Sequence, residues 1–138
     1  MHFDHVGLSV IDLDGMAEWY ANAFGWAITG GFEVPPIQLT GKFVVGTDGV
    51  AIELLKREGS VRPVSFDSVP TMAGNQGFGH IALRVTDVDA LHDRLVSLGA
   101  TSIMSPRPAP VPDSRMAYVA DPEGNFIELL TRKGPVGA

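Results

Sequence analysis

Apolar and polar positions near the N-terminus alternate and then change to helical spacing. In residues 3–11 apolar side chains occupy every second position, which predicts a strand with one buried face. The next segment predicts an amphipathic helix that Asp12 or Asp14 caps and that Gly25 ends. The apolar face of this helix is expected to contain Met16, Trp19, Tyr20, Ala23 and Phe24.

The same order of elements occurs twice along the chain. Extended segments over residues 27–37 and 42–55 follow the first helix, with turn signals at Gly30–Gly31 and Asp48–Gly49. The second half predicts, in order, a strand with Ile81, Leu83 and Val85 on its apolar face, a helix capped by Asp87 or Asp89 and closed by Gly99, and strands near 101–104, 116–120 and 125–130. Each half is therefore expected to be β-α-β-β-β, and the fold class to be α+β.

A duplication explains this repetition. Shifted by 75 residues, Phe3–Asp14 falls on Phe78–Asp89, and Phe43–Leu55 falls on Tyr118–Leu130, without gaps. Both pairs of aligned segments use the same offset of 75 residues and have identical residues at several positions. This indicates two copies of one module.

The modules are expected to form one domain over residues 1–138. Their bounds are about 1–56 and 78–132, and a linker rich in Gly, Pro and Ser joins them over 57–77. The proline-rich segment Pro106–Asp113 is expected to be a loop inside the second module.

Composition narrows the classes of function. Hydrophobic residues make up 45% and charged residues 19% of the chain, as in globular proteins. The chain has no cysteine, so disulfides, thiolate metal sites and cysteine nucleophiles are excluded. A net charge of −6 argues against nucleic-acid or anionic-membrane partners. With neither a signal peptide nor a membrane-length apolar run, a cytoplasmic protein that acts on a small molecule is expected.

Four polar side chains interrupt the apolar pattern of the strands. His5, Glu53, His80 and Glu128 each lie on the strand face opposite the apolar neighbours, at positions that the duplication makes equivalent. Two imidazoles and two carboxylates suit a divalent nickel, cobalt, zinc, manganese or ferrous ion. Four protein ligands leave positions open for substrate, as in catalytic sites. The alternative is a set of two His–Glu ion pairs without metal.

Other polar residues have simpler explanations. His2 and His92 are expected on the surface, and Asp121 is expected to belong to a turn that enters the last strand.

Motifs around these four residues resemble a known family, the vicinal oxygen chelate superfamily of glyoxalases, bleomycin-resistance proteins and extradiol dioxygenases. The resemblance covers about residues 3–131, and the segments that carry it are DHVGLSV (Asp4–Val10), AIELL (Ala51–Leu55), GHIALRVTDVD (Gly79–Asp89) and DPEGNFIELL (Asp121–Leu130). It implies two tandem βαβββ modules that form a cupped mixed β-sheet around a central divalent metal. The family's metal ligands fall on His5, Glu53, His80 and Glu128.

The ligand set separates the activities found in this family. Members similar to glyoxalase I or methylmalonyl-CoA epimerase use four protein ligands, whereas extradiol dioxygenases hold ferrous iron with two His and one Glu. Glu53 therefore favours a lyase, isomerase or epimerase that stabilises an enolate or enediolate. By resemblance, Glu128 is the first candidate for the base and Glu53 the second. A ring-cleaving dioxygenase and a non-catalytic binding or antibiotic-resistance protein are the alternatives.

The resemblance also suggests substrate contacts and a homodimer. Ser9 and Val10 stand where relatives of glyoxalase I often carry an arginine for glutathione, and Arg84 occupies the symmetric position. The candidate substrate-binding residues are Ser9, Arg84, Arg115 and Tyr118. The substrate, the metal, the use of glutathione or CoA, and the sharing of the site between two chains stay open.

Overall fold

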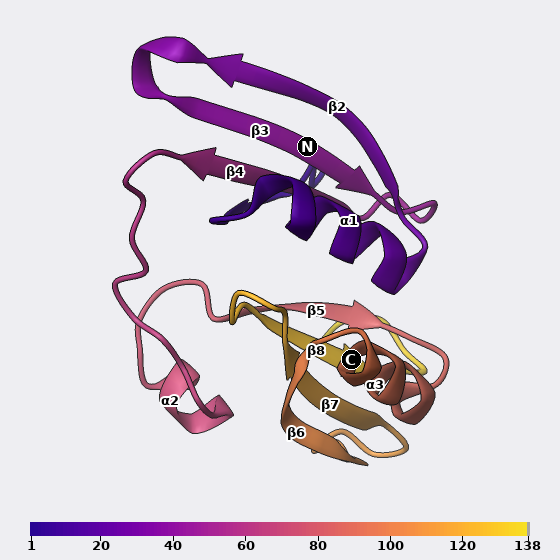
Figure 1. The fold of residues 1–138 in the computed structure, drawn as a ribbon. Helices are drawn as coiled ribbons and strands as arrows, with labels where there is room; N and C mark the ends of the chain where they lie inside the picture. Colours follow the sequence, from indigo (N-terminus) through magenta and orange to yellow (C-terminus); the bar gives the residue numbers. More distant parts are fainter. Residues whose placement is uncertain (138) are drawn as a thin grey trace. The chain divides into compact units, whose positions relative to one another are not determined.

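Each half of the chain forms a four-stranded sheet with one long helix against one of its faces (Figure 1). The computed structural model describes residues 1–137 and divides into two units, a first unit Met1–Pro63 and a second unit from Val64 onward. The first unit contains β1 (Val6–Ser9), α1 (Leu13–Phe24), β2 (Ala27–Val34), the 3₁₀ turn η1 (Pro35–Ile37), β3 (Leu39–Val45) and β4 (Ala51–Arg57). The second contains α2 (Val69–Ala73), β5 (His80–Arg84), α3 (Val88–Ser97), β6 (Thr101–Pro108), β7 (Arg115–Ala120) and β8 (Phe126–Leu130).

The two sheets have the same topology. The strand orders are β1-β4-β3-β2 and β5-β8-β7-β6. In each sheet the first strand pairs in parallel with the last, and the remaining neighbours are antiparallel. The prediction of an α+β fold with two tandem β-α-β-β-β modules is confirmed.

Capping residues define where the long helices begin. The Asp12 carboxylate accepts a hydrogen bond from the Gly15 amide, 3.0 Å away, and Asp87 does the same for the Ala90 amide at 3.0 Å. Each accounts for one of the unpaired N–H groups of the first helical turn. Gly25 ends α1 with a left-handed φ of 69°, which a glycine adopts without steric cost.

The core of each unit lies between its long helix and its sheet. In the first unit Tyr20 of α1 and Ile52 and Leu54 of β4 are almost completely buried, and in the second unit Leu95 of α3 and the strand residues Ile127 and Leu129 are. Alternation along a strand sends every second side chain to the other face. We call this other face, away from the long helix, the open face of each sheet.

Two local predictions are wrong. Gly30–Gly31 is no turn, because β2 continues through it with a bulge between Thr29 and Gly31. The segment predicted as a loop from Pro106 is still strand as far as Pro108. β6 is an edge strand, and an edge tolerates prolines because they need not donate a ladder hydrogen bond.

His92 is also placed differently from the prediction. Instead of lying on the surface, it is 7% exposed. Its Nε2 lies 2.8 Å from the Ser102 hydroxyl and its Nδ1 lies 3.2 Å from a carboxylate oxygen of Asp93. Both ring nitrogens therefore have partners, which makes the burial of this imidazole tolerable.

The segment expected to be only a linker contains the short helix α2. Ser68 caps it in a capping box with Thr71. Met72 of α2 is buried together with Tyr118 and Phe126, which belong to the open face of the second sheet. α2 therefore covers part of that open face. In the described chain no helix combines the length and the apolarity that crossing a bilayer requires.

Replacing the cap of α1 tests this account of the fold. Asp12→Ala should lower the free energy of unfolding by about 1 kcal/mol, because one amide of the first turn loses its acceptor. Asp12→Asn retains an acceptor and is the matched control. Both tryptophans, Trp19 and Trp26, lie in the first unit. Urea denaturation followed by their fluorescence therefore reports on the unit that contains α1. Equal stability of the two variants would contradict the capping role.

Candidate metal-binding and catalytic site

A histidine and a glutamate meet on the open face of the first sheet. Parallel pairing of β1 with β4 places Gly7 opposite Glu53, and His5 lies two residues before Gly7, on the same face. His5 Nε2 is 3.4 Å from Glu53 Oε2. The His5 side chain is 34% exposed and the Glu53 side chain 19% exposed, so both can be reached by an ion or a small molecule.

The second sheet repeats this pair. Parallel pairing of β5 with β8 places Ala82 opposite Glu128, and His80 begins β5 on the same face. His80 Nε2 is 3.1 Å from Glu128 Oε2. The predicted orientation of all four side chains, away from the long helices, is thus confirmed within each unit.

An aromatic ring stands beside each histidine. Phe43 of β3 contacts His5 edge to face with ring centroids 5.6 Å apart, and Tyr118 of β7 contacts His80 in the same way at 5.2 Å. Phe43 pairs across the strands with Glu53, and Tyr118 with Glu128. Burial, aided by the charge and the hydrogen bonding of the neighbouring Glu128 carboxylate, raises the pKa of Tyr118 to about 12.

Asp4 polarises the first histidine. His5 Nδ1 donates a hydrogen bond to Asp4 Oδ2 at 2.7 Å. This hydrogen bond, supported by the charge of the Glu53 carboxylate, raises the pKa of the His5 imidazole above its ordinary value, although desolvation opposes it. In the neutral ring, a proton fixed on Nδ1 leaves the lone pair of Nε2 for a metal.

The donor chemistry of each pair fits a divalent ion. Each unit presents one imidazole nitrogen and one carboxylate oxygen close together, the donor types that zinc, nickel, cobalt and manganese accept. Within residues 1–137, no cluster of three or more His, Asp or Glu side chains has the arrangement to hold a metal. Each pair by itself therefore supplies two ligands, a histidine and a glutamate.

The candidate substrate contacts differ in their surroundings. Ser9 ends β1 and is exposed on its open face. Arg84 ends β5 and donates a hydrogen bond from Nη2 to the Gly134 carbonyl at 2.9 Å. Arg115 makes two hydrogen bonds of 2.7 Å to the Asp89 carboxylate, which lower the pKa of that carboxyl group. Tyr118 contacts His80, a proposed metal ligand.

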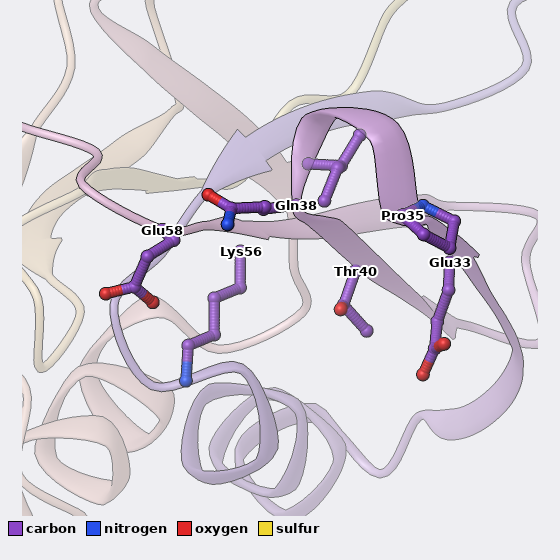
Figure 2. Close-up of a pocket in the computed structure, with 7 residues that line it drawn as sticks. Glu33, Pro35, Gln38, Thr40, Lys56 and Glu58 are labelled. Carbon is purple, nitrogen blue, oxygen red and sulfur yellow. The ribbon is translucent and has the colours of Figure 1, made fainter.

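The first unit also has an open hollow of about 320 Å³ near the β2–β3 turn. Figure 2 shows Glu33, Thr40 and Lys56 projecting to the same side there. Lys56 lies two residues after Leu54 and therefore on the same face of β4, the face toward the helix. Glu53 lies on the opposite, open face. The hollow is thus separate from the His5–Glu53 pair. Its lining residues are Glu33, Pro35, Gln38, Leu39, Thr40, Lys56 and Glu58.

Two neighbours of the His–Glu pairs were not foreseen in the sequence. The only hint of the contact with Asp4 is that an acidic residue directly precedes His5. Met72 lies in the supposed linker, and no pattern links it to Tyr118, which it covers.

Comparison with known proteins gives a consistent result. Residues 2–129 match the model of the Glyoxalase/Bleomycin resistance protein/Dioxygenase superfamily. A lactoylglutathione lyase of Arabidopsis thaliana is 31% identical over 136 residues, which are 96% of this chain and 44% of that protein. A probable lactoylglutathione lyase of Vibrio cholerae is 30% identical over 132 residues, covering 94% of this chain and 89% of that protein. The chain thus spans less than half of the plant relative.

Solved structures show the same fold. The crystal structure of glyoxalase I from Zea mays is 26% identical, with a TM-score of 0.74, and the match covers 96% of this chain and 45% of that one. A glyoxalase family protein from Bacillus cereus has a TM-score of 0.78 at 20% identity, with 97% and 95% covered.

The hydrogen bond to Asp4 predicts a shift in the titration of His5. Asp4→Asn should lower the His5 pKa, because the carboxylate that stabilises the protonated ring is removed. NMR titration of the His5 imidazole Cε1–H signal in metal-free protein measures this pKa. An unchanged His5 titration would show that Asp4 does not polarise this ring.

Proposed function

Because the chain belongs to the glyoxalase/bleomycin resistance protein/dioxygenase superfamily, we propose that it is a divalent-metal-dependent lyase or isomerase of the glyoxalase I or epimerase type. The observation that carries the proposal is the repeated His–Glu pair, His5 with Glu53 and His80 with Glu128, at equivalent positions of two sheets. The relatives named as lactoylglutathione lyases support the same reaction class.

The four residues are the proposed ligands of the metal. Carboxylates that are only 18–19% exposed lose hydration, and a bound cation compensates this loss. When bound, a divalent ion supplies Lewis-acid stabilisation of the negative charge that develops on a substrate oxygen. A substrate with an acidic C–H next to a carbonyl is the class that benefits from this chemistry.

The chain's own residues would then move the proton. One of the two glutamates would accept the proton from the substrate C–H, and the electron pair of that bond would be delocalised toward the carbonyl oxygen. In a glyoxalase I-type isomerisation the proton would return to the neighbouring carbon, while the hydroxyl proton on the first carbon moves to the former carbonyl oxygen. In an epimerisation the proton would return to the opposite face of the same carbon. Neither reaction needs an oxidant or a reductant.

Candidate substrate contacts lie around this chemistry. Ser9 at the end of β1 presents a hydroxyl on the open face, and Arg84 is the cation at the equivalent position of β5. Either can bind a polar or anionic part of the substrate. As in the sequence-based expectation, the active protein is proposed to be a homodimer.

Metal analysis tests the proposal. Protein purified without a histidine tag should contain about one nickel, cobalt, zinc or manganese ion per chain by elemental mass spectrometry. It should also catalyse deuterium incorporation from D₂O into 2-oxoaldehyde hemithioacetals or 2-substituted acyl thioesters. The metal affinity of His80→Asn should be lower than that of the parent by at least about tenfold. His2→Asn, at an exposed position near the N-terminus, is the control.

Two results would overturn this function. Ferrous iron together with oxygen uptake on catechols would assign ring cleavage instead. Failure to bind any of these ions after reconstitution would leave a metal-free binding protein.

A further inference from the structure

A serine, a histidine and an aspartate form a hydrogen-bonded chain in the second unit. His92 lies on α3 and is 7% exposed. Its Nε2 is 2.8 Å from the hydroxyl oxygen of Ser102 on β6, and its Nδ1 is 3.2 Å from a carboxylate oxygen of Asp93. We call these three residues the Ser–His–Asp trio. A nucleophile within hydrogen-bond reach of a base that a third group orients is the arrangement used for acyl transfer.

The trio lies on the helix side of the second sheet, away from the open face that carries Glu128. Across the strands Ser102 pairs with Val119, and Val119 pairs with Ile127, which belongs to the core under α3. Side chains that pair directly across strands share a face of the sheet. The sheet itself therefore stands between the trio and the proposed metal ligands of this unit.

The partners of the two ring nitrogens define the tautomer of His92. An ionised carboxylate only accepts hydrogen bonds, so the Nδ1 that faces Asp93 carries the ring proton. The lone pair of Nε2 is then directed at the hydroxyl of Ser102, which donates to it. In this orientation an imidazole can take the proton of a serine hydroxyl.

The first module has apolar residues at the equivalent positions. Helix α1 begins 75 residues before α3, which makes the completely buried Ala17 the equivalent of His92. Ile28 is the equivalent of Ser102, because their partners on the neighbouring strand are 75 residues apart. The module therefore folds without this polar pair, and packing of the helix on the sheet does not account for a buried imidazole here.

Ser102 can be reached from solvent, and the backbone that follows it is irregular. It is exposed on β6, which is an edge strand. A bulge places Ile103 between the two paired residues Ser102 and Met104. Bulges interrupt the regular ladder and redirect side chains, and they are frequent beside active sites. The Ile103 amide, one residue after the serine, is thus a candidate donor to a negatively charged oxygen.

We propose that the Ser–His–Asp trio is a second catalytic site, which hydrolyses small activated esters through an acyl-serine. Ser102 Oγ attacks the ester carbonyl carbon while its proton passes to His92 Nε2. The C–O bond to the alcohol then breaks, and the alcohol leaves with that proton. Asp93 is a positioning residue that holds the imidazole, and the Ile103 amide would stabilise the charge on the carbonyl oxygen.

Water completes the reaction. A water molecule gives a proton to His92 Nε2 and attacks the acyl carbon, and the proton returns to Ser102 Oγ as the carboxylic acid leaves. The net change is ester plus water to acid plus alcohol, so neither a metal nor an oxidant or reductant is needed.

Covalent labelling tests the nucleophile. The full chain is incubated with a small alkyl fluorophosphonate, whose fluoride a reactive serine displaces, and the modified residue is located by peptide mass spectrometry. Ser102 should be labelled, whereas Ser105, an exposed serine of the same strand, should not. Absence of label on Ser102, or equal labelling of both serines, would overturn the proposal.

The base is tested by two substitutions of His92. In His92→Ala and in His92→Gln the labelling rate of Ser102 should fall at least about 100-fold. Glutamine retains much of the buried volume but cannot act as the base, and circular dichroism during heating checks that each variant is folded. Undiminished labelling in folded His92→Gln would exclude His92 as the base.

Turnover is measured with p-nitrophenyl acetate by the release of p-nitrophenolate. Ser102→Ala should lose at least about 100-fold of the catalysed rate, and Ser105→Ala should retain it. Addition of EDTA should not change the rate, because no member of the trio is a proposed metal ligand, so the result does not depend on the proposed function. A rate that Ser102→Ala retains, or that EDTA abolishes, would assign hydrolysis to another site.

The role of Asp93 has a readout of its own. The ¹⁵N chemical shifts of the His92 ring should show a proton on Nδ1 in the parent and a mixture of tautomers in Asp93→Ala, with recovery in Asp93→Glu. Because the Asp93 side chain is 85% exposed, water screens the contact, and kcat should fall by less than about tenfold with KM unchanged. An unchanged tautomer in Asp93→Ala would refute the positioning role.

Discussion

Parallel pairing between the first and last strands of each unit is the constraint on which the site depends. One face of each strand pair packs on the long helix, so alternation forces the intervening side chains onto the open face. The strand pairing that places Gly7 opposite Glu53, and Ala82 opposite Glu128, then fixes the position of each glutamate along its strand, beside its histidine. A shift of one residue in either ladder would bury the carboxylate under the helix.

Much of this arrangement is predictable from the sequence because it depends on short-range patterns. Period-two alternation and the spacing of apolar residues locate the strands and helices, and Asp12 and Asp87 mark where the helices begin. The offset that relates His5 to His80 also relates the two glutamates, so the ligand candidates emerge without any knowledge of the three-dimensional fold.

What could not be predicted depends on contacts between segments far apart in the chain. Pro108 belongs to a strand because β6 lies at an edge, and His92 is buried because Ser102, on β6, accommodates its ring. The polarity of the sequence around Pro108 and His92 carries no information on the sheet edge or on Ser102. Met72 is likewise buried because it packs on the apolar surface around Tyr118. No turn or helix signal in the nearby sequence predicts that surface.

The duplication conserves the backbone ladders of the two halves more strictly than the side chains around the His–Glu pairs. Phe43 lies across the strands from Glu53, whereas Tyr118 lies across from Glu128. On the first strand of each unit, Gly7 lies opposite Glu53 and Ala82 lies opposite Glu128. Such neighbours can change without altering the strand register, because the register depends on backbone hydrogen bonds and on the buried face of each strand.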